Sequence, residues 1–126
     1  MGAAMSEAKT YTGGCHCGKV RWTTTMALDS LATCNCSICW KTGAIMAFVP
    51  SDAFGLTAGG DALADYQFGK KSVHHEFCTT CGVRSFSYGA AADGKKTYCV
   101  NVRCLDGVDE VAIGKVPTKM YDGKAL

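Results

Sequence analysis

Nine cysteines in a chain of 126 residues are the feature that most constrains the fold of this protein. They form three short groups and two single positions: Cys15 and Cys17; Cys34, Cys36 and Cys39; Cys78 and Cys81; and Cys99 and Cys104. The N-terminal residues contain no secretory signal, so we expect the thiols to stay reduced. Clustered, reduced cysteines at short spacing favour metal binding over a disulfide framework.

A glycine follows the last cysteine of the first and third groups, at Gly18 and Gly82. Glycine readily adopts the positive φ that metal-binding turns often need, and such turns leave backbone N–H groups free to point at sulfur. Two thiolates two or three residues apart can supply two corners of a zinc tetrahedron. The two groups therefore look like halves of one saturated, structural zinc site formed by four residues: Cys15, Cys17, Cys78 and Cys81.

The middle group offers three ligands within six residues and is followed by Trp40 rather than glycine. Catalytic zinc is usually held by three protein ligands beside an open fourth position. This group therefore favours an open, catalytic zinc site at Cys34, Cys36 and Cys39, which gives two zinc ions per chain. Two alternatives stay open: a thiol cluster without metal, or a closed site with a fourth ligand from Cys99, Cys104, His74 or His75.

The other cysteines and histidines, and three arginines, have simpler interpretations. Cys99 and Cys104 are an odd number of residues apart, so on one strand they would face opposite ways and could not chelate together. We interpret the two cysteines as core or inert surface thiols, the histidines as polar packing residues and the arginines as solvated strand positions: Cys99, Cys104, His16, His74, His75, Arg21, Arg84 and Arg103.

Hydrophobic alternation with a period of two predicts a mainly β domain, because no stretch of a dozen residues keeps helical periodicity. The predicted strands cover residues 19–23, 44–50, 73–77, 85–88 and 98–103, with 44–50 buried on both faces. Short helical turns are expected at residues 36–43 and 50–55, and Gly- and Asp-rich loops at 57–71 and 89–96.

Charge and hydropathy narrow the class of partner. The formal net charge is +2, with no basic tail and no stripe of basic and aromatic residues, so we expect no nucleic-acid partner. No run of 18 apolar residues is present, so we expect no membrane span and a cytoplasmic location. The sequence carries no signal for an oligomeric state.

Three cysteine-bearing segments, "GGCHCGKVRW", "CNCSICWKTGA" and "FCTTCG", together resemble the glutathione-dependent formaldehyde-activating enzyme (GFA) family, which includes the centromere protein V group. The similarity continues less specifically through "YCVNVRCLDGVD" and "KMYDGKAL". It implies a β-tent of small antiparallel sheets around a structural zinc, with a second zinc beside it. It also assigns the four-cysteine set to the structural zinc and the three-cysteine set to the catalytic zinc. Residues 11–126 would form this domain, after an N-terminal extension at 1–10.

The resemblance implies a zinc-dependent carbon–sulfur lyase that acts on the adduct of glutathione, or a similar thiol, with formaldehyde or another small aldehyde. The thiol would fill the open position on the second zinc. Glutathione carries two carboxylates, and Lys41, with the turn at Thr42 and Gly43, offers the nearest partners in sequence. The alternative is a non-catalytic module, stabilised by zinc, that binds a partner or carries a thiol.

Overall fold

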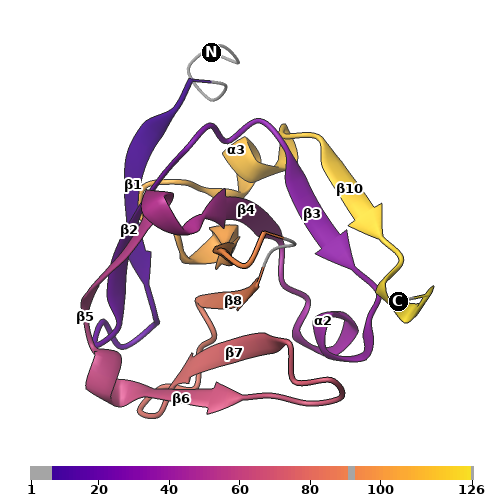
Figure 1. Cartoon of the computed structure of the whole chain (residues 1–126). Helices are drawn as coiled ribbons and strands as arrows, with labels where there is room; N and C mark the ends of the chain where they lie inside the picture. The colour runs from indigo at the N-terminus through magenta and orange to yellow at the C-terminus, as the bar shows by residue number, and fades with distance from the viewer. Residues whose placement is uncertain (1–6, 91–92, 126) are drawn as a thin grey trace.

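Two β-sheets, one of three strands and one of seven, make up most of the protein (Figure 1). The computed structural model describes residues 7–90 and 93–125. The smaller sheet has the order β1-β2-β5, with the bounds Lys9–Gly14, Arg21–Met26 and Phe54–Ala58. The larger sheet has the order β10-β3-β4-β9-β8-β7-β6, with the bounds Thr118–Tyr121, Leu31–Cys34, Met46–Pro50, Lys96–Asn101, Phe86–Ala90, Val73–Cys78 and Leu63–Tyr66.

The helical segments are short and lie in the connections between strands. In residues 7–90 and 93–125, two are α-helical and four are 3₁₀ turns: α2 (Ser37–Thr42), α3 (Glu110–Gly114), η1 (Ser51–Ala53), η2 (Gly60–Ala62), η3 (Val102–Cys104) and η4 (Gly123–Ala125). None of the helices in the described part of the chain combines the length and apolar character of a membrane span. The two sheets therefore form the framework of the protein, and the short helices connect their strands.

Strand pairing is antiparallel throughout the two sheets with one exception. The last strand, β10, pairs in parallel with β3, so that Thr118 lies opposite Leu31 and Tyr121 opposite Cys34. The prediction of a mainly β fold of small sheets is confirmed, and this pair is the one departure from an antiparallel arrangement. Its consequence is that the C-terminal residues are brought directly beside the end of β3 (Figure 1).

The core lies between the two sheets, and Trp22 of β2 is its central link. This side chain is fully buried, and its ring lies 5.6 Å from that of Phe54, which in turn lies 4.9 Å from Phe86. Its indole N–H donates to Ser85 Oγ at 2.9 Å, so its polar group is satisfied. Burying an aromatic side chain removes about 150–250 Å² from water, which stabilises the fold by about 4–6 kcal/mol before entropy is counted.

The predicted strands are present as β2, β4, β7, β8 and β9, and the predicted helical turns as α2 and η1. The loop prediction for 57–71 is wrong for β6 and the end of β5, because their side chains are largely exposed and lack an alternating pattern. β4 is not buried on both faces, since Phe48 is 53% exposed. β1 begins at Lys9, inside the predicted N-terminal extension, of which residues 1–6 lie outside the described residues.

Candidate metal centres

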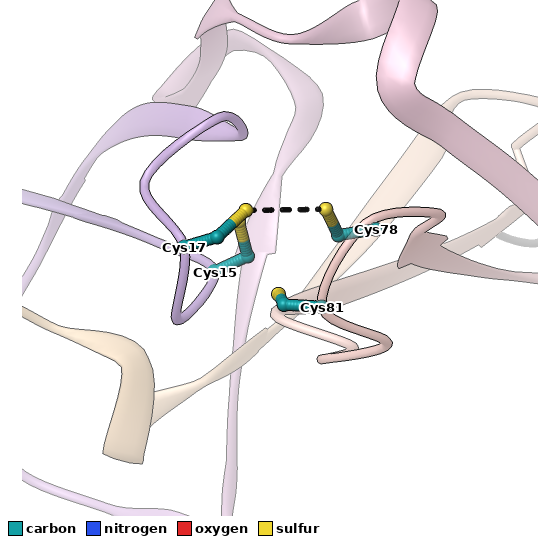
Figure 2. A group of neighbouring side chains, drawn as sticks. All are labelled: Cys15, Cys17, Cys78 and Cys81. Carbon is teal, nitrogen blue, oxygen red and sulfur yellow. Dashed lines mark hydrogen bonds between the residues drawn. The ribbon is translucent and has the colours of Figure 1, made fainter.

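Two tight turns present the cysteines of the first centre. One joins β1 to β2 and the other joins β7 to β8, and Figure 2 shows their thiols facing one another. In the first turn, Gly18 has φ +84° and its N–H donates to the Cys15 carbonyl at 3.3 Å. In the second, Gly82 has φ +79° and its N–H donates to the Cys78 carbonyl at 2.8 Å. The positive φ predicted for both glycines is therefore present, and it allows each turn to close.

The four sulfurs brought together by these turns, here called the four-cysteine centre, have the spacing of metal ligands. They belong to Cys15, Cys17, Cys78 and Cys81 and all lie within 4.8 Å of one another. The Sγ–Sγ distances are 3.6 Å for Cys15–Cys17 and 3.7 Å for Cys17–Cys78. A zinc tetrahedron with Zn–S bonds of about 2.3 Å has edges of about 3.8 Å. The spacing fits zinc and is far too long for a disulfide.

Backbone N–H groups point at these sulfurs, as expected around thiolates. Val20 N–H donates to Cys15 Sγ at 3.3 Å, and Thr80 N–H donates to Cys78 Sγ at 3.4 Å. The N–H of Val83 lowers the pKa of Cys81 to about 6. Donors aimed at sulfur favour the ionised form that a metal requires.

Three further cysteines gather where β3 runs into α2, and they form the three-cysteine cluster: Cys34, Cys36 and Cys39. Cys34 ends β3, Cys36 is the N-cap residue of α2, and Cys39 lies within that helix. The helix stops at Gly43, which has φ +69° and donates its N–H to the Cys39 carbonyl at 2.9 Å. The end of β3 and the start of α2 thus bring three sulfurs within 4.8 Å of one another.

No fourth ligand from the described residues completes this cluster. No other cysteine, histidine or carboxylate among them places a ligand atom within 4.8 Å of all three sulfurs. The alternatives considered from the sequence, Cys99, Cys104, His74 and His75, therefore lie outside the group. The protein itself supplies three soft ligands here, against four at the other centre.

The electrostatics of the cluster call for a cation. Burial, together with the neighbouring Cys36 and Cys34, raises the pKa of Cys39 to about 12, against the opposing charge of Arg84. Three thiols this close cannot all ionise unless positive charge is supplied, and thiolate ligands suit zinc. The residues present therefore fit a zinc ion held by three sulfurs.

The C-terminal turn, residues 121–125, packs directly against the three-cysteine cluster. Asn35, between two of the cysteines, donates its backbone N–H to the Tyr121 carbonyl at 3.2 Å and its side-chain N–H to Asp122 Oδ1 at 2.9 Å. Its side-chain oxygen accepts from the Lys124 N–H at 3.1 Å. A Cβ on Gly123 would lie 2.5 Å from Cys34 Sγ. The backbone at Gly123 therefore lies so close to Cys34 Sγ that no residue with a Cβ would fit without a shift.

A pocket of about 290 Å³ opens beside the cluster. Its lining includes two of the cluster cysteines and two exposed apolar side chains: Cys34, Cys39, Trp40 and Met120. Trp40 is 74% exposed and Met120 is 62% exposed. This volume is close to the lower limit for small-molecule sites, and two of the three cluster cysteines border it.

The remaining candidate residues are exposed, ion-paired or partly buried. Lys41 is exposed at the end of α2, and His16 is exposed on the first cysteine turn. His74 pairs with Asp65 at 2.7 Å. Cys99 and Cys104 are partly buried, and burial raises the pKa of each to about 11, so neither is a reactive thiolate at neutral pH.

Arg84 differs from its interpretation as a solvated strand position. It is half-buried in the loop before β8, where NH1 donates to His75 Nδ1 at 2.9 Å and NH2 to Thr42 Oγ1 at 3.1 Å. No local pattern signals this contact, because Arg84 and Thr42 are 42 residues apart in the sequence. Asn35 and Gly123 were likewise missed, although both lie in segments quoted for the family resemblance.

Comparison with known proteins gives two findings. The profile of a family described as glutathione-dependent formaldehyde-activating enzyme matches residues 10–118, a span that includes both cysteine groups. A crystal structure of a Rhodobacter sphaeroides protein is similar to this chain at 33% sequence identity, with a TM-score of 0.74. The similarity covers 86% of this chain and 99% of that one.

Proposed function

Because the chain belongs to the glutathione-dependent formaldehyde-activating enzyme family, we propose that it is a zinc-dependent carbon–sulfur lyase. Its substrate would be the adduct of glutathione, or a similar thiol, with formaldehyde or another small aldehyde. The four-cysteine centre would hold a structural zinc, and the three-cysteine cluster a catalytic one. The cytoplasmic location stays a prediction from the sequence.

The observation that carries this proposal is the unequal number of ligands at the two centres. A centre with four thiolates is saturated and has no position for a substrate, whereas three thiolates leave one open. The pocket beside Cys34 and Cys39 gives a small molecule a route to that position. A zinc ion held there would supply a soft Lewis acid that lowers the pKa of a substrate thiol.

In the synthetic direction, the substrate sulfur forms a bond to the aldehyde carbon. The π electrons of the C=O bond move to oxygen, which takes up a proton, and the product is a hydroxymethyl thioether. The reverse reaction breaks the carbon–sulfur bond and releases the aldehyde. The cluster cysteines bind metal and are not the nucleophile. Trp40 and Met120 offer apolar contacts beside the reacting thiol, and Lys41 is a candidate partner for a glutathione carboxylate.

Exchange spectroscopy with ¹³C-formaldehyde and glutathione tests the activity on zinc-loaded protein. We expect the protein to accelerate exchange between free aldehyde and the adduct, and Cys36→Ser to return the rate to the spontaneous one. Cys104→Ser is the matched control, because it removes a partly buried thiol outside both clusters. An exchange rate in wild-type protein equal to that in buffer would overturn the proposal.

The non-catalytic alternative draws support from exposed apolar side chains near the three-cysteine cluster. These are Trp40, Phe48, Met120 and Tyr121, each more than 40% exposed. A binding module would hold both zinc ions equally firmly and would not change its metal coordination with a thiol. A second zinc that chelators remove more readily, and whose environment changes with glutathione, supports the enzyme instead.

A further inference from the structure

The backbone that carries Arg84 is held firmly on both sides. Three residues earlier in the chain, Cys81 belongs to the four-cysteine centre. On the other side, the Arg84 carbonyl accepts from Asn101 Nδ2 at 3.4 Å, and the next residue, Ser85, accepts from the Trp22 indole at 2.9 Å. A guanidinium on such a fixed base can recognise a ligand without a large entropic cost.

The guanidinium reaches toward the three-cysteine cluster. Its NH2 group donates to Thr42 Oγ1 at 3.1 Å, and that hydroxyl in turn donates to the Cys39 carbonyl at 3.4 Å. Thr42 lies three residues after Cys39, which is about 4.5 Å along a helix. The charge of Arg84 also acts on the thiols of Cys39 and Cys99. Arg84 is therefore a neighbour of the cluster, although it holds no metal.

Much of the hydrogen-bonding capacity of Arg84 is unused. A guanidinium has five N–H donors and no acceptor, so Arg84 is the donor to His75 Nδ1, and that imidazole is neutral with its proton on Nε2. One further donor goes to Thr42. No carboxylate pairs with Arg84 among residues 7–90 and 93–125; both of its side-chain partners there are neutral. Arginine forks bind carboxylates better than any other side chain does.

We propose that Arg84 binds a carboxylate of the thiol substrate, so that the three-cysteine site selects anionic thiols over neutral ones. This inference rests on the proposed function, and it names the substrate class. Glutathione carries such a carboxylate on its glycine, one residue beyond the cysteine that bears the sulfur and within about 7 Å of extended chain. Thr42 and His75 are positioning residues that fix the guanidinium plane.

Calorimetric titration of zinc-loaded protein with glutathione and with glutathione diethyl ester tests this directly. The ester keeps the thiol and removes both carboxylates. In wild-type protein we expect glutathione to bind about ten- to a hundredfold more tightly than the ester, the range for a hydrogen bond to a charged group. Arg84→Gln should lose that preference by weakening glutathione alone. Arg103→Gln, which removes an exposed positive charge, should keep it.

Each other result overturns the inference in a distinct way. If Arg84→Gln weakens both ligands by the same factor, Arg84 only supports the cluster. If wild type does not discriminate, or if Lys41→Gln abolishes discrimination while Arg84→Gln does not, the carboxylate partner is not Arg84. If neither thiol binds to wild type, the proposed function fails as well. Should Arg84→Gln not retain two zinc ions, Thr42→Val replaces it and is expected to weaken glutathione selectively.

Discussion

A methyl group added at Gly123 is expected to loosen the metal at the three-cysteine cluster while sparing the other centre. Its Cβ would lie 2.5 Å from Cys34 Sγ and 2.7 Å from Cys36 Cβ. Ordinary contacts between such atoms begin at about 3.5 Å, so either the cysteines or the C-terminal turn must move by about 1 Å. Gly123 shows no positive φ, so the substitution acts through this clash and not through backbone strain.

The size of the effect follows from the cost of overpacking. Extra methyl groups in a packed site cost about 1–3 kcal/mol, and each 1.4 kcal/mol is a factor of ten in affinity. If the strain falls on the sulfurs, zinc affinity at the three-cysteine cluster should drop by about 5- to 150-fold. The four-cysteine centre serves as an internal reference, because no atom of it is among the nearest neighbours of Gly123.

Competition with a chromogenic zinc chelator measures both affinities in one titration of Gly123→Ala. Gly114→Ala is the matched control, since a Cβ at that position would have no neighbour within 4 Å. The reasoning is refuted if Gly123→Ala releases its more labile zinc at the wild-type chelator concentration. Loss of global stability without loss of zinc affinity would show that the turn moves and does not position the sulfurs.

Three further predictions concern the centres and the surrounding fold. Cys81→Ser should abolish folding, because binding of a structural zinc contributes about 10–16 kcal/mol whereas the free energy of unfolding of a whole domain is only about 5–15 kcal/mol. Cys36→Ser should instead retain one zinc and a cooperative thermal transition. Asp106→Asn should lower stability by less than about 1 kcal/mol at neutral pH, because the exposed pair with Arg21 is screened by solvent. Hydrogen bonding to Arg21 lowers the pKa of Asp106, so wild-type stability in excess of the variant should disappear in denaturant titrations as the pH falls below 3.8. Burial, with the adjacent guanidinium, lowers the pKa of His75 below 6.5, so stability should fall as the pH drops through 6.5, and ¹⁵N NMR should show a smaller protonated fraction at that pH than for a free imidazole.

The local chemistry of the centres could be predicted from the sequence. Thiols two or three residues apart must share a turn, and a glycine after the last cysteine allows that turn to close with positive φ, as Gly18 and Gly82 do. The family resemblance carried by these segments is confirmed over residues 10–118. Strands with one buried face were predictable for the same reason, since alternation along a strand is a local property. Five strands escaped prediction. β5, β6 and β10 have mostly exposed side chains without such alternation, and the short segments of β1 and β3 hold too few large apolar side chains to show it.

What only the tertiary structure decided is which distant segments meet. The sequence predicted that the first and third cysteine groups pair, but it left a fourth ligand at the second group open. The structure places no such ligand there among the described residues, and it brings Gly123 against Cys34, far away in the chain. The contact of Arg84 with Thr42 spans 42 residues. Covalent geometry limits what neighbouring residues can do, so a short motif carries its own turn and ligands. Contacts across the sheets depend instead on the packing of the whole core around Trp22, and no single segment contains that information.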